Sequence, residues 1–289
     1  NRVEMLKELQ FPNSLGLMYS AFTSFTGFRV NSGEYKVMGL APYGEPKYSE
    51  RIFDKLIDLK DDGSISLNMD YFSFPYSNCM TNKKFAQLFD GPRRLAESDL
   101  TQREMDLACS VQVVVEEVVL RMARHARKLI NSKNLCLAGG VALNCVSNGK
   151  LLKAGIYDEI WIQPAAGDAG GALGAAYGAY FKDGRQKRTV SLTDSMKGSF
   201  LGPKYDDDQI RSFLEKNSVK HQYLDDNQIF GKVAGIIAGG NVVGWFQERM
   251  EFGPRALGNR SILGDPRSGE MQEMMNLKIK YRESFRPFA

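Results

Sequence analysis

The longest hydrophobic pattern in the chain is helical. Thr101 and Glu104 stand in the Thr-x-x-Glu order of a capping box, and apolar residues recur three and four positions apart behind them. This spacing gathers the apolar side chains on one face of a helix. The pattern predicts one long amphipathic helix over residues 101–130. Its apolar stripe consists of Leu107, Val111, Val114, Val115, Val118 and Met122.

Short apolar runs alternate with helical patterns after this helix. We expect strands over residues 134–138 and 159–163, followed by helices over 142–154 and 169–181. This alternation predicts an α/β fold with a parallel pair of strands. Both strands run into glycine-rich corners, "LAGGVALN" and "PAAGDAGGALGAA". Glycine lets a ligand approach the backbone, and the following helix offers N–H groups to phosphates. The alternative, that these glycines serve only tight turns and helix packing, stays open.

The remaining patterns are shorter or interrupted. Residues 64–76 alternate as a strand would, and the spacing of Gly and Pro in "GLAPYGEP" predicts an ordered loop that neither a helix nor a strand contains. Residues 184–226 are polar without a sustained period, which predicts a connector. A helix that stops at Gly239 and Gly240, followed by a strand over residues 241–246, predicts the start of a second domain.

Composition and charge mainly exclude classes of protein. The chain has 289 residues, of which 43% are hydrophobic and 25% charged, as expected for a soluble globular protein of one or two domains. A net charge of +4 is too small for general nucleic-acid binding. No apolar run reaches the ~18 residues that a membrane span requires. Four cysteines without a Cys-x-x-Cys pair, two of them in apolar surroundings typical of buried thiols, indicate a reducing, cytoplasmic compartment.

The two histidines do not form a metal or catalytic pattern. His125 lies on the long predicted helix and His221 in the predicted connector, and neither has a second ligand at metal spacing. We expect both at the surface. The sequence also has no Gly-x-Ser-x-Gly motif and no Ser/His/Asp or Cys/His arrangement, which disfavours hydrolysis through a covalent intermediate.

Asp168 begins the helix that follows the second glycine corner. The helix dipole favours an ionised carboxylate there, and such a carboxylate can hold a cation. A plain helix cap would look the same in the sequence, so both interpretations stay open. Gly170, Gly174 and Gly178 recur every four residues behind Asp168 and leave one helix face without side chains, which predicts close packing against a neighbour.

The end of the chain is basic and is interrupted by Gly and Pro. The strings "ERMEFGPRALGNRSILGDPR" and "NLKIKYRESFRPFA" place their cations in turns rather than along a helix face. Arginine presents a planar fork that suits bidentate contact with phosphate. We favour a phosphate-binding cluster over a solvated basic surface. Its members are Arg249, Arg255, Arg260, Lys280 and Arg282, with Ser261 beside them.

These strings, together with "FPNSLGLMYSAFT" and "EYKVMGLAPYG", resemble the O-carbamoyltransferases of the nodulation-protein-U and cephalosporin or tobramycin carbamoylation type. The resemblance covers most of the chain outside residues 50–100 and 184–225. It implies an actin-like ATPase (ribonuclease H-like) lobe over residues 1–200, a connector over 201–224 and the start of a YrdC-like α/β domain over 225–289. An N-terminal segment and most of the second domain would then lie outside this chain.

The resemblance also implies roles for single residues. The residues expected to contact ATP are Lys36, Gly39, Gly139, Gly140 and Asn144, the first two from the opposite lobe. Asp168 corresponds to a ligand of a divalent metal, iron or magnesium, whose two histidines would precede residue 1. Arg249, Lys280 and Arg282 fall where the family contacts phosphate. At two positions this chain departs from the pattern, because Glu248 replaces a glycine and Asn13 replaces a histidine.

The implied activity has two steps. Carbamoyl phosphate and ATP would yield carbamoyl-adenylate in the YrdC-like domain, and the carbamoyl group would pass to a hydroxyl of a sugar or natural product. The expected partners are these small molecules, without nucleic acid or membrane, and a homodimer stays open, as does turnover by this chain alone. The alternatives are a small-molecule kinase of the actin-like fold and a non-catalytic nucleotide-binding module.

Overall fold

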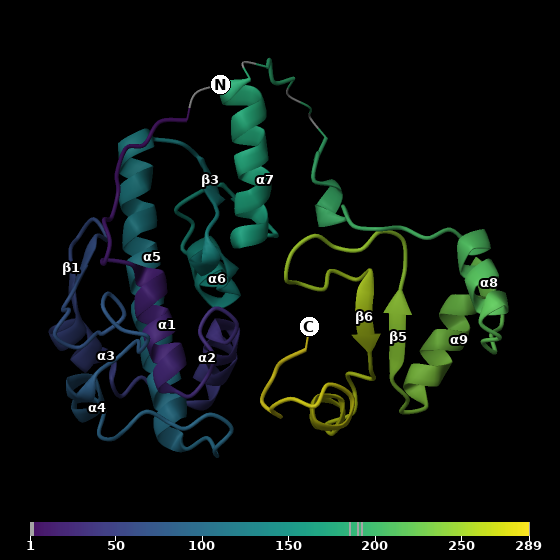
Figure 1. Cartoon of the computed structure of the whole chain (residues 1–289), viewed down its shortest axis with the longest axis horizontal. Coiled ribbons are helices and arrows are strands. Elements are labelled where there is room, and N and C mark those ends of the chain that lie inside the picture. The colour runs from purple at the N-terminus through teal and green to yellow at the C-terminus, as the bar shows by residue number, and fades with distance from the viewer. Residues whose placement is uncertain (1–2, 185, 190, 192, 289) are drawn as a thin grey trace. The chain divides into compact units, whose positions relative to one another are not determined.

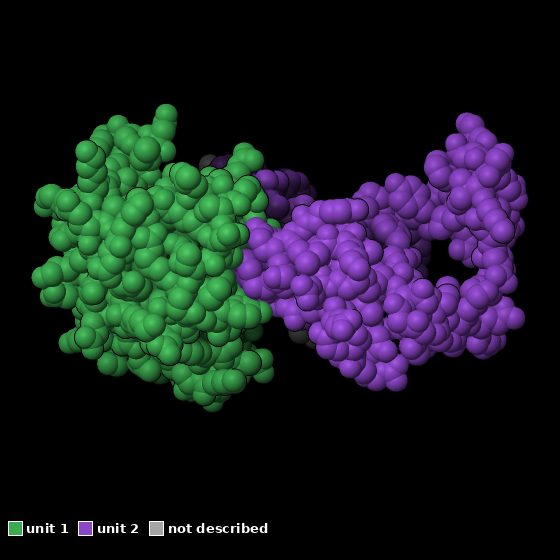
Figure 2. Space-filling model, turned by 90° about the horizontal axis from the view of Figure 1, so that it is seen from below, with its two compact units in different colours: residues 1–167 green, residues 168–289 purple. Residues whose placement is uncertain are grey.

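The computed structural model describes residues 3–184, 186–189, 191 and 193–288 (Figure 1). Contacts between residues divide the chain into two compact units, unit 1 (Asn1–Gly167) and unit 2 (Asp168–Ala289), which Figure 2 colours separately. The domain limits expected from the resemblance lie elsewhere, and they stay a prediction. The actin-like and YrdC-like folds stay predictions too, while the α/β class is confirmed by helices and small sheets in both units.

Unit 1 is organised around helix α5 (Gln102–Ile130), which confirms the longest helix predicted from the sequence. The capping box forms, because the Thr101 N–H donates to the Glu104 carboxylate at 3.1 Å. The apolar stripe is buried from Leu107 to Val118. The helix ends at Asn131, whose φ of 51° is left-handed. The helices that pack against α5 include α1 (Leu15–Phe25), α2 (Glu34–Leu40), α3 (Ser49–Arg51) and α6 (Cys145–Lys153).

Aromatic side chains form the core beside α1. Phe22 and Phe25 of α1 meet Phe85 of α4 (Lys83–Leu88) edge to face, with ring centroids 5.2 and 4.9 Å apart. Phe89 follows α4 and lies 4.7 Å from Phe85 by the same measure. All four rings are fully buried. This cluster fixes α1 against the segment that precedes α5.

The predicted parallel pair is present. Strands β3 (Asn134–Leu137) and β4 (Glu159–Ile162) pair in parallel with Leu135 opposite Ile160, and α6 connects them. The helix expected from residue 142 begins only at Cys145, because Gly140–Leu143 form a 3-10 turn first. The carboxyl ends of β3 and β4 therefore lead into the two glycine corners on the same side of the pair, where α/β proteins bind ligands.

Two expectations in the first half of the chain were wrong. The strand expected over residues 64–76 extends only over β2 (Ile65–Leu67), which pairs with β1 (Ile57–Leu59) in antiparallel fashion. The strand stops because the Asn68 side chain accepts from the Asp70 N–H and turns the chain. The segment "GLAPYGEP" begins inside α2 and continues as a 3-10 turn, Ala41–Tyr43. Pro42 is tolerated there because the first turn of a helix needs no N–H from it.

Unit 2 contains more helix than the sequence suggested. Helix α8 (Asp207–Lys216), which was not expected, lies inside the stretch predicted as a connector, and the connector role stays a prediction. Asp206 and Gln209 form a capping box at its start, a pattern that the sequence does contain. Helix α9 (Asp226–Ala238) ends at the predicted glycines, and the antiparallel strands β5 (Val243–Phe246) and β6 (Arg260–Leu263) follow. The other helical elements are α7 (Asp168–Gly178), a π-helical turn (Ala179–Asp183), a 3-10 turn (Lys197–Ser199), α10 (Met271–Met274) and a second π-helical turn (Met275–Ile279).

Helix α7 is largely exposed, and only Gly170, Leu173 and Gly178 are half-buried among its described residues. Close packing of its glycine face was expected, but α7 has no buried residue in the described chain, and a Cβ added at Gly174 or Gly178 would meet no described atom within 4 Å. The expectation was wrong because no described segment covers that face. In the described chain, no helix combines the length and the apolar character needed to cross a membrane.

Candidate functional site

The two glycine corners lie side by side and are joined by a hydrogen bond. The Gly139 N–H donates to the carbonyl of Ala166, in the second corner, at 2.8 Å. Gly139 has φ 95° and ψ 161°, a conformation that in practice only glycine adopts. A Cβ added at Gly139 or Gly140 would meet no described atom within 4 Å, so the first corner is open to a ligand. This arrangement fits the predicted nucleotide contact.

Asn144 fixes the first corner to α5. Its Oδ1 accepts from the Ser147 N–H at 3.0 Å, which caps α6. Its Nδ2 donates to Gln112 Oε1 at 2.9 Å, and Gln112 Nε2 donates back to Asn144 Oδ1 at 3.1 Å. Asn144 is 9% exposed. The predicted nucleotide contact of Asn144 stays a prediction, and the structure assigns its side chain to this amide pair.

The amide pair belongs to a larger buried polar network. Tyr19 of α1 donates to Gln112 Oε1 at 3.1 Å, and Gln112 Nε2 also donates to Glu116 at 2.9 Å. Glu116 in turn pairs with Lys150 of α6. Burial, together with the nearby carboxylates of Glu34 and Glu116, raises the pKa of Tyr19 well above its usual range. Tyr19 therefore stays a neutral donor, and the network connects α1, α5 and α6 beneath the corner.

Helix α2 carries Lys36 and Gly39 and lies next to the same corner. Met38 of α2 contacts Cys145, the first residue of α6, with the two sulfur atoms 3.8 Å apart. The Lys36 ammonium lies 5.4 Å from the centre of the Phe28 ring. Gly39 is half-buried within α2. Lys36 and Gly39 lie in unit 1 with the first glycine corner, and their approach to a nucleotide from an opposite lobe stays a prediction.

The segment after α2 is clamped to α5. The Asp106 carboxylate accepts from the Glu45 N–H at 2.9 Å and from Lys47 Nζ at 2.9 Å. Burial would raise the pKa of Asp106, but these hydrogen bonds lower it overall. Gly44 fits here because a Cβ would lie 2.0 Å from the Met105 carbonyl oxygen. The clamp fixes the end of α2 and thereby the position of Lys36 and Gly39.

Asp168 is an exposed residue at the first position of α7. Within the described ranges, no three His, Cys, Asp or Glu side chains gather closely enough to hold a metal ion. The described residues therefore do not supply the three or more side-chain ligands that a divalent metal needs. Metal binding at Asp168 stays a prediction that needs ligands from elsewhere.

The predicted phosphate-binding cations all belong to unit 2, where hydrogen bonds within the unit hold Arg249, Arg260 and Arg282. Arg249 donates to the Gly202 carbonyl at 3.0 Å. Arg260 of β6 donates through Nε to Glu251 at 2.9 Å. Arg282 donates to Asn276 at 2.6 Å. Arg255 lies in the loop before β6, Ser261 lies in β6 opposite Trp245, and Lys280 is exposed after the last helical turn.

Glu251 is a buried carboxylate that the sequence analysis missed. It is 5% exposed and accepts hydrogen bonds from the Leu257, Asn259 and Arg260 backbones. Burial alone would raise its pKa, but the backbone hydrogen bonds and Arg260 lower the pKa to about 2. A single acid between Met250 and Phe252, within a Gly-rich and Pro-rich turn, is the sequence pattern that could have indicated it.

Asn276 was also missed. Its side chain is fully buried and donates to the carbonyls of Ser284 at 3.0 Å and Arg286 at 2.8 Å. Its Oδ1 accepts from Arg282, whose guanidinium also lies 4.8 Å from the centre of the Phe288 ring. One amide therefore orders the segment that carries Lys280 and Arg282.

The two positions that depart from the family pattern have structural explanations. Glu248 has φ 50°, a left-handed conformation that costs glycine nothing, which gives a physical reason for glycine in the pattern. Its side chain pairs with Lys204 at 2.6 Å on the surface. Asn13, in the place of a histidine, accepts from the Leu67 N–H at 2.9 Å and so secures the end of β2.

The expected environments of the cysteines and of one histidine were wrong. Cys79, Cys136 and Cys145 are exposed and Cys109 is half-buried, all as free thiols. Cys136 is exposed because it faces outward from β3, where no described segment covers it. His221 is exposed as expected. His125 is half-buried, and its Nε2 is buried without a hydrogen-bond partner among the described residues.

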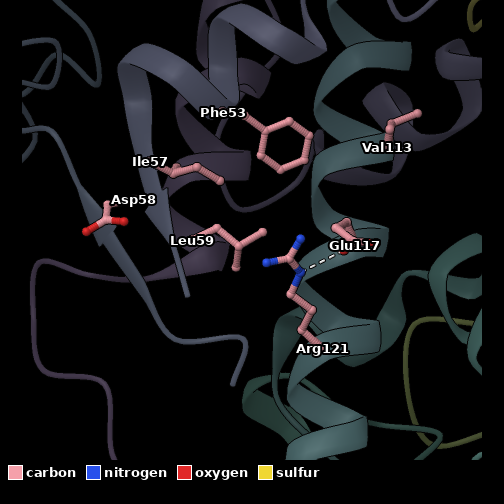
Figure 3. A pocket seen from close by; sticks show the side chains of 7 residues that line it. All are labelled: Phe53, Ile57, Asp58, Leu59, Val113, Glu117 and Arg121. Atoms are coloured by element: carbon pink, nitrogen blue, oxygen red, sulfur yellow. Dashed lines mark hydrogen bonds and ion pairs between the residues drawn. The ribbon is translucent and has the colours of Figure 1, made fainter. Parts of the chain in front are cut away.

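Figure 3 shows a groove on unit 1 between β1 and α5, with a volume of about 570 Å³. Its apolar side chains come from β1, from α5 and from the π-helical turn that precedes β1 (Ile52–Leu56), and Arg121 Nε donates to Glu117 at 2.7 Å within it. Val113 and Glu117 follow Gln112 and Glu116 along α5 by one residue, and one residue turns a helix by about 100°. The groove therefore lies on a different face of α5 from the amide network. Its lining residues are Phe53, Ile57, Asp58, Leu59, Val113, Glu117 and Arg121.

Comparison with known proteins identifies the class to which this arrangement belongs. Residues 1–177 match the family described as "Carbamoyltransferase N-terminus", and residues 234–289 match "Carbamoyltransferase C-terminus". The chain therefore belongs to the carbamoyltransferase family, as its motifs suggested.

Individual relatives agree with this membership. The chain is 62% identical over 284 residues to an uncharacterized protein of Synechocystis sp., covering 98% of this chain and 46% of the relative. It is 40% identical over 287 residues to nodulation protein NolO of Bradyrhizobium diazoefficiens, covering 97% of this chain and 49% of the relative. Nodulation protein U of the same organism is 34% identical over 177 residues, which are 61% of this chain and 28% of that protein. The chain thus spans about half the length of the first two relatives.

Proposed function

We propose that this chain carries the transfer site, and the beginning of the activation site, of an ATP-dependent O-carbamoyltransferase. Membership of the carbamoyltransferase family supports carbamoyl transfer. The structural observation that carries the proposal is the pair of joined glycine corners, Gly139 to Ala166, at the carboxyl ends of two parallel strands. Such corners receive phosphate-bearing ligands in α/β proteins.

The proposed reaction has three steps. Carbamoyl phosphate is hydrolysed to carbamate and inorganic phosphate. A carbamate oxygen attacks the α-phosphorus of ATP, so that a P–O bond forms and pyrophosphate leaves. The acceptor hydroxyl then attacks the carbamoyl carbon and loses its proton, and AMP leaves with the electrons of the broken C–O bond. Adenylation thus supplies a good leaving group for an otherwise unreactive carbamate.

The residues of unit 1 would hold the adenylate. The backbone at Gly139 and Gly140 would approach the nucleotide, and Asn144 would keep that backbone in place through α5. Lys36 and Gly39 would approach from α2, which contacts the same corner through Met38.

The residues of unit 2 would act on phosphate. Positive side chains stabilise the charge that develops on phosphate oxygens in the transition state, often the largest catalytic contribution. Arg249, Arg255, Lys280 and Arg282 would supply this charge, with the Ser261 hydroxyl as a neutral donor. The acceptor would be a hydroxyl of a sugar or natural-product scaffold.

Product analysis tests the proposal. The chain is incubated with ATP and carbamoyl phosphate, and pyrophosphate, inorganic phosphate and ADP are measured. Pyrophosphate and phosphate in equal amounts are expected, and pyrophosphate should disappear when carbamoyl phosphate is omitted. ADP without pyrophosphate would instead support a kinase. Nucleotide binding without either product would support a non-catalytic nucleotide-binding module.

A further inference from the structure

The loop between β5 and β6 closes around one carboxylate oxygen. Glu251 Oε1 accepts from the N–H groups of Leu257 at 2.8 Å, Asn259 at 2.9 Å and Arg260 at 3.1 Å. Backbone donors that converge on a buried carboxylate are fixed in position, because each would lose a charged acceptor on moving. The end of the loop is therefore tied to its beginning.

The second oxygen of the same carboxylate holds a predicted phosphate ligand. Arg260 Nε donates to Glu251 Oε2 at 2.9 Å, and Arg260 Nη2 lies 3.5 Å from the Glu251 carbonyl oxygen. The Glu251 side chain is 1% exposed and that of Arg260 is 38% exposed. An external phosphate would have to compete with this internal carboxylate. The geometry thus gives Arg260 a role within the loop.

Backbone pairing fixes the first part of the loop from outside. The Gly202 N–H donates to the Met250 carbonyl at 2.9 Å, and the Phe252 N–H donates to the Ser199 carbonyl at 2.7 Å. Glu251 lies between these two anchors. Its backbone is held from one side while its side chain holds the other end of the loop.

The segment between the anchored ends carries Arg255. Gly253 has φ 122° and Gly258 has φ 107°, so on each side of Arg255 the backbone adopts a conformation that favours glycine. A loop with both ends fixed presents its central side chain at a smaller entropic cost than a free loop does.

We propose that Glu251 is a positioning residue of the carbamoyl-phosphate site, and that Arg260 acts with it and not on phosphate. The inference rests on the proposed function, which places the phosphate of carbamoyl phosphate at the cations of unit 2. Glu251 acts through Arg255, because its carboxylate holds the loop that presents this cation. A neutral side chain at residue 251 would leave the loop free to adopt other conformations.

The test is a double-mutant cycle in the 289-residue chain, with carbamoyl phosphate as the probe and its dissociation constant as the readout. Glu251→Gln keeps the shape and removes the charge, and should weaken binding about 10- to 100-fold. Arg255→Ala should also weaken binding. In the Arg255→Ala background, Glu251→Gln should change affinity less than about twofold, because its effect passes through Arg255. A merely structural role would not produce this non-additivity.

Two further variants control for charge and folding. Glu270→Gln makes the same charge change at an exposed residue of unit 2 and should bind as the wild type does. Amide hydrogen exchange at Leu257 and Asn259, measured without ligand, should accelerate in Glu251→Gln and not in Glu270→Gln. If Glu251→Gln does not fold, Glu251→Asp replaces it, since it keeps the charge and shortens the reach, and it should lose affinity to a smaller extent.

The outcomes separate this inference from the function on which it rests. Equal affinity of the wild type and Glu251→Gln, or full additivity with Arg255→Ala, overturns the positioning role while leaving the proposed function intact. A wild-type chain that does not bind carbamoyl phosphate overturns the proposed function, and the inference with it, before any substitution is made.

Discussion

At the residue scale, three buried polar side chains each hold a turn of the backbone. Asp106 accepts from the Glu45 N–H, Asn144 from the Ser147 N–H, and Glu251 from three N–H groups of its own loop. Buried N–H groups need acceptors, and a turn cannot supply them from regular secondary structure. These side chains therefore determine loop conformations that apolar packing would leave undefined.

The pKa of Glu251 predicts a pH dependence of stability. The folded value is about 2 and the ordinary value 4.5, so the unfolded chain binds more protons between these pH values. The stabilisation is complete above pH 4.5 and is lost as the pH falls toward 2. Glu251→Gln should lower the free energy of unfolding at pH 7 by about 1–3 kcal/mol and flatten its fall at acid pH. Urea unfolding at pH 7 and pH 3 measures both.

Some acid sensitivity should remain in Glu251→Gln, because Arg267 lowers the pKa of Asp265 to about 2 as well. Glu270→Gln, at an exposed position, should follow the wild type at both pH values. A Glu251→Gln variant with the wild-type stability at both pH values would show that the carboxylate does not stabilise the fold.

The buried amide pair predicts a second effect. Gln112→Leu keeps a side chain of similar volume but removes the hydrogen-bond partner of Asn144, Tyr19 and Glu116. Each buried polar group left without a partner costs about 1–3 kcal/mol, so the free energy of unfolding should fall by at least about 2 kcal/mol. Gln87→Leu, at an exposed residue, should change it by less than about 0.5 kcal/mol. Similar small losses in both variants would contradict the structural importance of the network.

At the element scale, sustained periodicity was the reliable predictor. The stripe of α5 and the alternation that gives β3, α6 and β4 were predicted because burial on one face repeats over many residues. The short elements were not. Helix α8 was missed because only its capping box marks it within a polar segment, and the 3-10 turn after α2 because Gly and Pro interrupt the helical pattern without ending the helical backbone.

Two glycines in unit 1 predict opposite responses to alanine. Gly44 lies against α5, where a Cβ would come within 2.0 Å of the Met105 carbonyl oxygen, so Gly44→Ala should destabilise the fold by about 3 kcal/mol or more. Gly149 lies inside α6 with open space at its Cβ, so Gly149→Ala should stabilise it by about 0.5–1 kcal/mol. Thermal unfolding of both variants measures the contrast, and effects of equal sign would contradict the packing of the 44–47 segment on α5.

At the scale of the whole molecule, the sequence indicates which residues form the site better than it indicates the buried side chains that hold them in place. The glycine corners follow from strand–helix alternation, and the structure joins them. These buried side chains are identified by contacts between residues far apart in sequence, such as Gln112 with Asn144, or by burial, as for Glu251. No local pattern specifies either. The cations in the basic stretch were predicted by type, whereas the internal partners of Arg260 and Arg282 emerge only from the fold.

The most direct test of the central claim is carbamoyl-phosphate-dependent exchange of labelled pyrophosphate into ATP, because it reports reversible adenylation without requiring the acceptor. The account predicts label in ATP when both carbamoyl phosphate and the protein are present. It predicts a loss of about tenfold or more in Arg255→Ala. ATP that stays unlabelled in an assay where the protein binds both ATP and carbamoyl phosphate would contradict the account.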